Sequence, residues 1–146
     1  MQPKLYPFFE RDLLKLIEEL NLYRTDEDIW KVPEGISNPA GNLVLHLAGN
    51  LQHFIGATLG KTGYVRERDR EFSQKGLSRA LLITQVEETN AVLRQTLSRL
   101  SEEDLEKDFP IPINNHVSST ITVLVYLLAH LNYHLGQVNY HRRLTA

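Results

Sequence analysis

Four long segments of the chain repeat apolar residues at intervals of three and four, and this spacing constrains the fold more than any other feature. It is the period of an amphipathic helix, whose apolar face must be buried against other elements. The segments are Lys4 to Leu22, Ala40 to about Leu59, Ser78 to Leu100, and Ser118–Thr120 to about Leu144. Without a convincing strand pair, the sequence predicts an all-α protein, specifically a four-helix bundle.

The segments between these helices are rich in residues that interrupt helical periodicity. Tyr23–Pro39 holds two prolines and is predicted to be a structured loop. Residues 61–76, KTGYVRERDREFSQKG, carry charge without a period and predict an exposed connection. The stretch DFPIPINNH, residues 108–116, predicts an extended or hairpin excursion.

Serines mark where two of the predicted helices begin. Ser78 is expected to cap the third long helix, and Ser101 with Asp104 has the spacing of a capping box for one short turn. The last helix is the most apolar part of the chain, so it is expected to be the most buried.

Length and composition fit one domain spanning residues 1–146 and exclude several classes of function. A formal net charge of −2 disfavours partners such as nucleic acid or anionic lipid. With no cysteine, the chain has no thiolate nucleophile, and any metal must be bound by His, Asp or Glu. Leu5–Leu22 carries charges that a signal peptide lacks, and no apolar run is long enough to span a bilayer. We therefore expect a cytoplasmic protein with no membrane partner.

Histidines lie beside the apolar face of the last helix, in the stretch LLAHLNYHLGQVNYH. With His130 at 0° on a helical wheel, His134 lies near about 40° and Gln137 near about 340°, next to the arc of core leucines. The second predicted helix has a matching stripe, made of His46, Asn50 and His53. If both apolar arcs enter one core, the two polar stripes face each other across one groove.

The spacing of His130 and His134 places two imidazoles on consecutive turns, close enough to bind one ion, and His46 offers a third ligand. Three nitrogen ligands suit zinc, nickel, iron or copper and leave positions for water or substrate. The competing interpretation is a set of buried, hydrogen-bonded histidines. His116 is expected to be a turn or cap residue.

Several motifs together resemble the metal-binding DinB/YfiT-like superfamily: SNPAGNLVLHLAGN in residues 37–50, the helix after EFSQKGLS, and AHLNYHLGQ in residues 129–137. The resemblance covers nearly the whole chain. It implies a four-helix bundle, a homodimer, and a divalent metal held by His46, His130 and His134. Zinc or nickel is favoured, with iron as an alternative. Characterised members include S-transferases for low-molecular-weight thiols such as bacillithiol or mycothiol, and a thiol-dependent maleylpyruvate isomerase.

Three functions follow as hypotheses. The first is a metal-dependent enzyme that transfers a small thiol co-substrate to a small electrophile, with Asn50, His53 and Gln137 as candidates for catalytic support. The second is metal-assisted hydrolysis, whose general base would be His53 or Glu34, because neither histidine stripe contains a carboxylate. The third is a non-catalytic, metal-stabilised homodimer that binds a ligand.

The arginines of the charged connection, residues 61–76, have two possible interpretations. Arg66, Arg68 and Arg70 could attract an anionic thiol, but the favoured interpretation is a solvated run balanced by neighbouring acids. The balancing residues are Glu67, Asp69 and Glu71.

Overall fold

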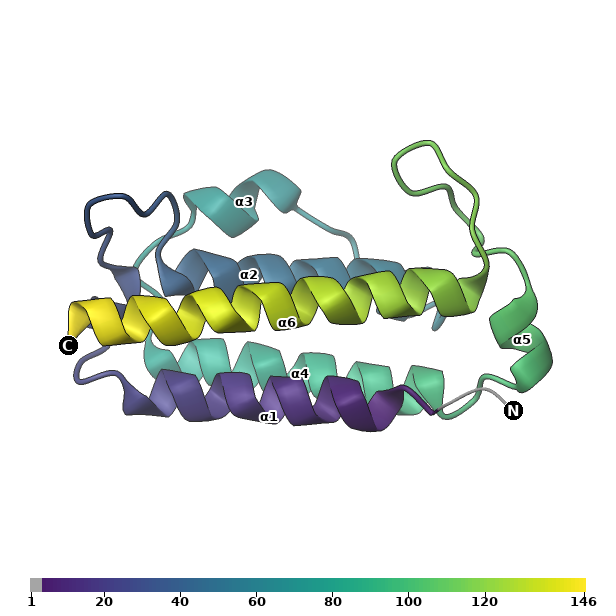
Figure 1. Cartoon of the computed structure of the whole chain (residues 1–146), viewed down its shortest axis with the longest axis horizontal. Helices are drawn as coiled ribbons and strands as arrows, with labels where there is room; N and C mark the ends of the chain where they lie inside the picture. Colours follow the sequence, from purple (N-terminus) through teal and green to yellow (C-terminus); the bar gives the residue numbers. More distant parts are fainter. Residues whose placement is uncertain (1–3) are drawn as a thin grey trace.

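The structure is a computed structural model that describes residues 4–146, and over those residues it is all-helical (Figure 1), as predicted. In chain order the elements are α1 (Tyr6–Leu22), the 3₁₀-helix η1 (Glu27–Trp30), α2 (Ala40–Leu51), the π-helix η2 (Gln52–Ala57), α3 (Arg68–Ser73), α4 (Arg79–Leu97), α5 (Glu102–Glu106) and α6 (Thr120–Thr145). None of the helices within residues 4–146 has the length and apolar character needed to cross a membrane.

The four long helices lie side by side (Figure 1). Helix α1 contacts both α4 and α6, and helix α2 contacts the same two helices. In the view of Figure 1, α1 and α6 run toward the end of the molecule where the label C lies, and α2 and α4 run in the opposite direction. Helix α3 lies over α2, on the side that the other three leave open.

Serine side chains cap the starts of α4, α5 and α6, the first two as the sequence predicted. Ser78 accepts a hydrogen bond from the Leu81 amide at the start of α4. Ser101 and Asp104 form a complete capping box at α5. At α6 the cap is Ser119, which accepts from the Thr122 amide. These contacts satisfy amides that the first turn of a helix leaves without intrahelical partners.

Helix α2, and not α6, is the most buried helix of the structure. All twelve residues of Ala40–Leu51 are buried, because α3, α4 and α6 cover this helix from different sides. Helix α6 instead presents Tyr126, Tyr133 and Tyr140 to solvent with exposed fractions of 51%, 65% and 65%. The expectation that the last helix is the most buried was wrong, because one face of α6 is left in solvent and exposes Val125 and Leu144 as well as the tyrosines.

The predicted helix that begins at Ala40 keeps its regular α form only to Leu51. Its remainder, Gln52–Ala57, winds as a π-helix packed on α4. Two glycines permit this contact: a Cβ at Gly56 would lie 3.0 Å from Val92 Cγ1, and one at Gly60 would lie 2.5 Å from Thr96 Oγ1. The π turn changes the winding after Asn50, so positions beyond it leave the regular helical wheel.

A buried histidine ties the end of α6 to the first loop. His141 Nδ1 lies 2.6 Å from the Tyr23 hydroxyl, and Nε2 lies 2.8 Å from the carbonyl oxygen of Lys31. Because a carbonyl oxygen only accepts, Nε2 carries the proton and Nδ1 accepts from Tyr23. The residue is 2% exposed and does not reach solvent. Burial lowers the pKa of His141, against the opposing effect of the hydrogen bond to Lys31.

This ring makes part of the stability depend on pH. Its folded-state pKa is lowered, so wild type loses stability as pH falls through the unfolded value of about 6.5 toward the lower folded value. We expect His141→Gln to start from a lower unfolding free energy near about pH 8 and to fall less steeply toward about pH 5. The slopes of unfolding free energy against pH should differ between the two proteins by at most about 1.4 kcal/mol per pH unit. Urea denaturation at several pH values measures both slopes.

His116→Gln is the matched control, because His116 lies in an exposed turn. It should keep the slope of the wild type. Equal slopes for His141→Gln and wild type would contradict the assignment of a buried neutral ring.

Candidate metal centre

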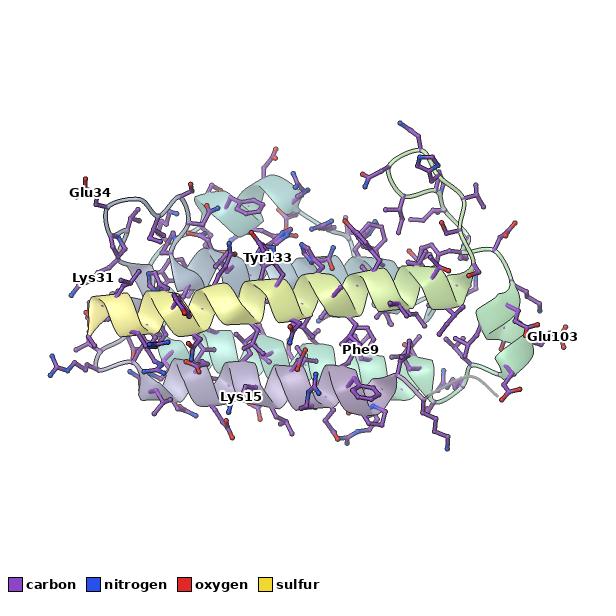
Figure 2. The ribbon with its side chains drawn as sticks, viewed as in Figure 1. Phe9, Lys15, Lys31, Glu34, Glu103 and Tyr133 are labelled. Carbon is purple, nitrogen blue, oxygen red and sulfur yellow. The ribbon has the colours of Figure 1, made fainter. Side chains whose placement is uncertain are left out.

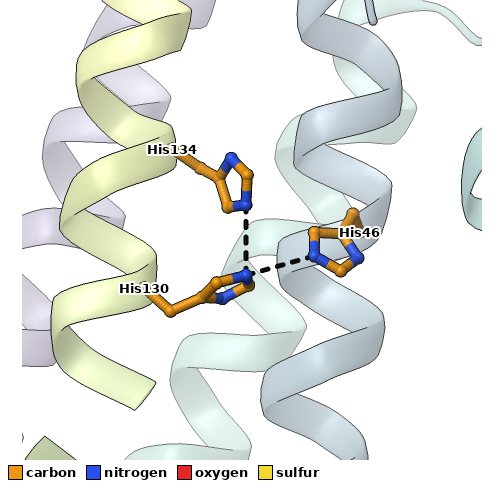
Figure 3. Close-up of side chains that lie close together, drawn as sticks. All are labelled: His46, His130 and His134. Atoms are coloured by element: carbon orange, nitrogen blue, oxygen red, sulfur yellow. Dashed lines mark hydrogen bonds between the residues drawn. The ribbon is translucent and has the colours of Figure 1, made fainter. Parts of the chain in front are cut away.

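Three histidines meet in the groove between α2 and α6 (Figure 3). His46 comes from α2, and His130 and His134 come from consecutive turns of α6. His130 Nε2 lies 3.2 Å from His46 Nε2 and 3.1 Å from His134 Nε2. One possible ligand atom from each residue lies within 4.8 Å of the other two. The structure thus brings together the three residues that the sequence singled out as metal ligands.

Hydrogen bonds at the outer nitrogens of two rings fix their tautomers. His46 Nδ1 lies 3.0 Å from Glu71 Oε1, and His134 Nδ1 lies 2.7 Å from Gln137 Oε1. The Gln137 amide nitrogen faces the Tyr133 hydroxyl at 3.4 Å. Carboxylate and amide oxygens only accept hydrogen bonds, so both Nδ1 atoms carry the proton. The Nε2 atoms that face His130 then keep their lone pairs free when the rings are neutral, which is the form that metal binding requires.

His130 lies between the other two rings. Its Nδ1 is buried and has no hydrogen-bond partner among residues 4–146. Burial, with smaller effects from His134 and His46, lowers the pKa of His130 to about 4. Burial likewise lowers the pKa of His134. Both rings are therefore neutral near physiological pH, and metal ligation requires neutral imidazoles.

The spacing of the rings fits one ion. Two nitrogen ligands at about 2.0–2.1 Å from an ion are separated by about 2.9 Å at a right angle and by about 3.4 Å at the tetrahedral angle. The observed separations of 3.2 Å and 3.1 Å around His130 Nε2 fall in that range. Three imidazoles could hold zinc, nickel, iron or copper with positions left for water or substrate.

The carboxylate beside His46 comes from the charged connection, residues 61–76, which was predicted to be a solvated charge run. Glu71, on α3, is 6% exposed and pairs with Arg66 through Nε at 2.9 Å and Nη2 at 3.0 Å. Burial raises the pKa of Glu71, but the hydrogen bonds from His46 and Arg66 outweigh it, so the pKa lies below its ordinary value. The solvated interpretation was wrong for Arg66 and Glu71, whereas Arg68 and Arg70 are exposed.

One signal in the sequence could have revealed this contact. Phe72 is an apolar residue within the charged run, and its ring centroid lies 4.9 Å from that of His46. An isolated aromatic residue in such a run indicates that one turn faces inward. Glu71 is carried to the site by that same turn.

The three candidates for catalytic support occupy different positions. Gln137 is exposed and binds His134, as described above. Asn50 is 7% exposed, and its Oδ1 has no hydrogen-bond partner in the described part of the chain. His53 lies on the π turn outside the ligand cluster and packs against Phe54, with 4.7 Å between ring centroids. Burial and the nearby Arg66 lower the pKa of His53.

The alternative base Glu34 lies far along the molecule from the histidines. It is exposed in the loop beyond the helix ends (Figure 2), whereas His46 and His130 lie near the middle of their helices. His116 is in a turn whose preceding residues, Asn114 and Asn115, have φ of 49° and 65°. This agrees with its expected place in a turn.

A hollow of about 240 Å³ opens one helical turn from the histidines. Its walls include Leu43 of α2, Gln137 and Tyr140 of α6, and loop residues 35–38. His141 borders it as well. Gln137 therefore touches both the hollow and His134. A second hollow, of about 410 Å³, lies between residues 64–74 and α4, and its lining includes none of the three histidines.

Comparison with known proteins assigns a family and no activity. The model of the family described as "Protein of unknown function (DUF1572)" matches residues 11–145, a span that includes all three histidines and Glu71. No curated protein shows a significant match to the chain. Because the family match covers nearly the whole chain, this protein belongs to the DUF1572 family.

Proposed function

We propose that this chain is a metal-dependent enzyme in which His46, His130 and His134 bind one divalent transition metal, and that its helices form the four-helix bundle of the DinB/YfiT-like superfamily. The convergence of three Nε2 atoms, with two Nδ1 protons directed to Glu71 and Gln137, carries the proposal. Zinc or nickel is favoured, with iron as the alternative.

The proposed reaction is transfer of a low-molecular-weight thiol to a small electrophile. A bound divalent metal supplies Lewis acidity that favours the thiolate form of such a thiol. The chain has no cysteine, so the sulfur nucleophile arrives as a substrate. The thiol sulfur forms a bond to a carbon atom of the electrophile as the bond from that carbon to its leaving group breaks. The leaving group departs with the electron pair of the broken bond, and the thiol proton passes to water.

The hollow beside Gln137 is the proposed binding place for the organic part of the substrates. Its volume of about 240 Å³ suits a small organic group. Leu43 gives it an apolar wall, and Gln137, Tyr140 and the loop at residues 35–38 supply polar groups. Substrate held there lies one turn from His134, which favours orientation of the reacting atoms.

Hydrolysis ranks second among the enzymatic functions because, within residues 4–146, the carboxylate that contacts the histidines is not free to act as a general base. The carboxylate of Glu71 is already paired with His46 and Arg66, and Glu34 is remote. His53 alone keeps the hydrolytic proposal open, since its pKa is lowered and its ring is half-buried.

Metal content tests the site directly. Untagged wild-type protein should contain close to one equivalent of metal by mass spectrometry, whereas His130→Ala and His134→Ala should lose it, because each removes one of three ligands. His116→Ala should retain the metal, since this histidine lies outside the cluster. Wild-type protein that takes up no metal even after reconstitution would refute the proposal.

Turnover tests the reaction. Metal-loaded protein incubated with bacillithiol or mycothiol and a chlorinated or epoxide electrophile should form the thioether, and His134→Ala should abolish its formation. Lack of metal-dependent turnover across a broad panel would instead favour the non-catalytic alternative, a metal-stabilised homodimer that binds a ligand. That alternative predicts a large fall in melting temperature on chelation, and light scattering would measure the oligomeric state.

A further inference from the structure

We infer that Glu71 is a positioning residue that holds His46 in the orientation and tautomer required for metal binding, and that Gly49 is required to leave space for its carboxylate. The part of this inference that concerns metal affinity rests on the proposed function. The part that concerns the tautomer can be measured without metal.

Helix α3 is fastened to α2 in a way that fixes the position of Glu71. Asn42, which is fully buried in α2, donates from Nδ2 to the carbonyl oxygens of Glu71 at 2.9 Å and Gln74 at 2.8 Å. Arg66 holds the carboxylate through two hydrogen bonds, from Nε to Oε2 and from Nη2 to Oε1, and its Nη2 also lies 3.5 Å from His46 Nδ1. The backbone and the side chain of Glu71 are thus each held in place, and Oε1, which also accepts from Arg66, faces His46 Nδ1 at 3.0 Å.

Gly49 is the point where the carboxylate lies against the backbone of α2. A Cβ built there would lie 2.6 Å from Glu71 Cδ and closer still to Oε2. Gly49 follows His46 by three residues, so both positions are on the same side of the helix. Glycine within a helix is destabilising relative to alanine. A structural reason for it here is that any side chain would displace the Glu71 carboxylate from His46.

The consequence concerns both nitrogens of His46. With Glu71 in place, Nδ1–H donates to Oε1 and Nε2 faces His130 with a free lone pair. Without that acceptor the imidazole exchanges between its two tautomers and the ring is free to turn. Loss of such an outer-shell partner typically weakens metal binding by about ten- to a hundredfold.

The first experiment compares Glu71→Ala, Glu71→Gln and the exposed control Glu67→Ala in folded, metal-free protein, with Zn²⁺ affinity measured by competition with a chelating dye. We expect Glu71→Ala to weaken binding by about ten- to a hundredfold. Glu71→Gln should weaken it less, because an amide oxygen still accepts from Nδ1. Glu67→Ala should bind as wild type does, since Glu67 is exposed and contacts none of the histidines.

The second experiment uses two of the helical glycines, Gly49 and Gly136, as a matched pair. Gly49→Ala should weaken Zn²⁺ binding about as much as Glu71→Ala, while Gly136→Ala, whose Cβ would meet nothing within 4 Å, should leave it unchanged. In the double variant Gly49→Ala with Glu71→Ala the two losses should not add, because the added methyl group then has no carboxylate to displace. Additive losses would overturn the role assigned to Gly49.

A nitrogen-15 NMR spectrum of metal-free protein gives the readout that is independent of metal. Wild type should show His46 protonated at Nδ1, and Glu71→Ala should show loss of that preference. If wild type binds Zn²⁺ and Glu71→Ala binds it equally well, the inference fails while the proposed function stands. If wild type takes up no metal even after reconstitution, the proposed function fails, and the tautomer of His46 alone supports or overturns the inference.

Discussion

The structure depends on one constraint, the complete burial of α2. On a helix with no solvent-facing side, a polar side chain is costly unless another element supplies its hydrogen-bond partner. Asn42 meets this requirement with two carbonyl oxygens of the α3 region, and His46 meets it with Glu71 on one side and His130 on the other. The charged segment 61–76 is therefore part of the core architecture, because it carries the acceptors that α2 needs.

Much of the fold could be predicted because its signals are local. Helical periodicity, the serine caps and the i,i+4 spacing of His130 and His134 each depend on residues within one or two turns. The meeting of His46 with His130 was predicted because matching stripes border two apolar faces that share a core. This inference used helix geometry alone and needed no knowledge of the connections.

What could not be predicted depends on contacts distant in sequence. In the sequence, Glu71 is one acidic residue of a balanced charge run. Only the packing of α3 over α2 shows that its carboxylate is the hydrogen-bond partner of His46. The burial of α6 was overestimated for a related reason. Apolar character does not reveal which helix will be covered, and α2 is covered by the short α3, a helix that has no periodic signal of its own. The reaction could not be predicted either, because one fold and one set of ligand atoms serve different chemistries in different proteins.

The order of the ligands along the chain has a consequence for folding. His46 and His130 are 84 residues apart, and His46 and Glu71 are 25 residues apart. Contacts closed over short loops form at lower entropic cost than those closed over long loops. The contact between His46 and Glu71 therefore closes at a lower entropic cost than the contact between His46 and His130. The two histidines of α6 are brought together by one helix. The site is complete only where α6 packs on α2, because His46 lies on one of these helices and the other two histidines lie on the other.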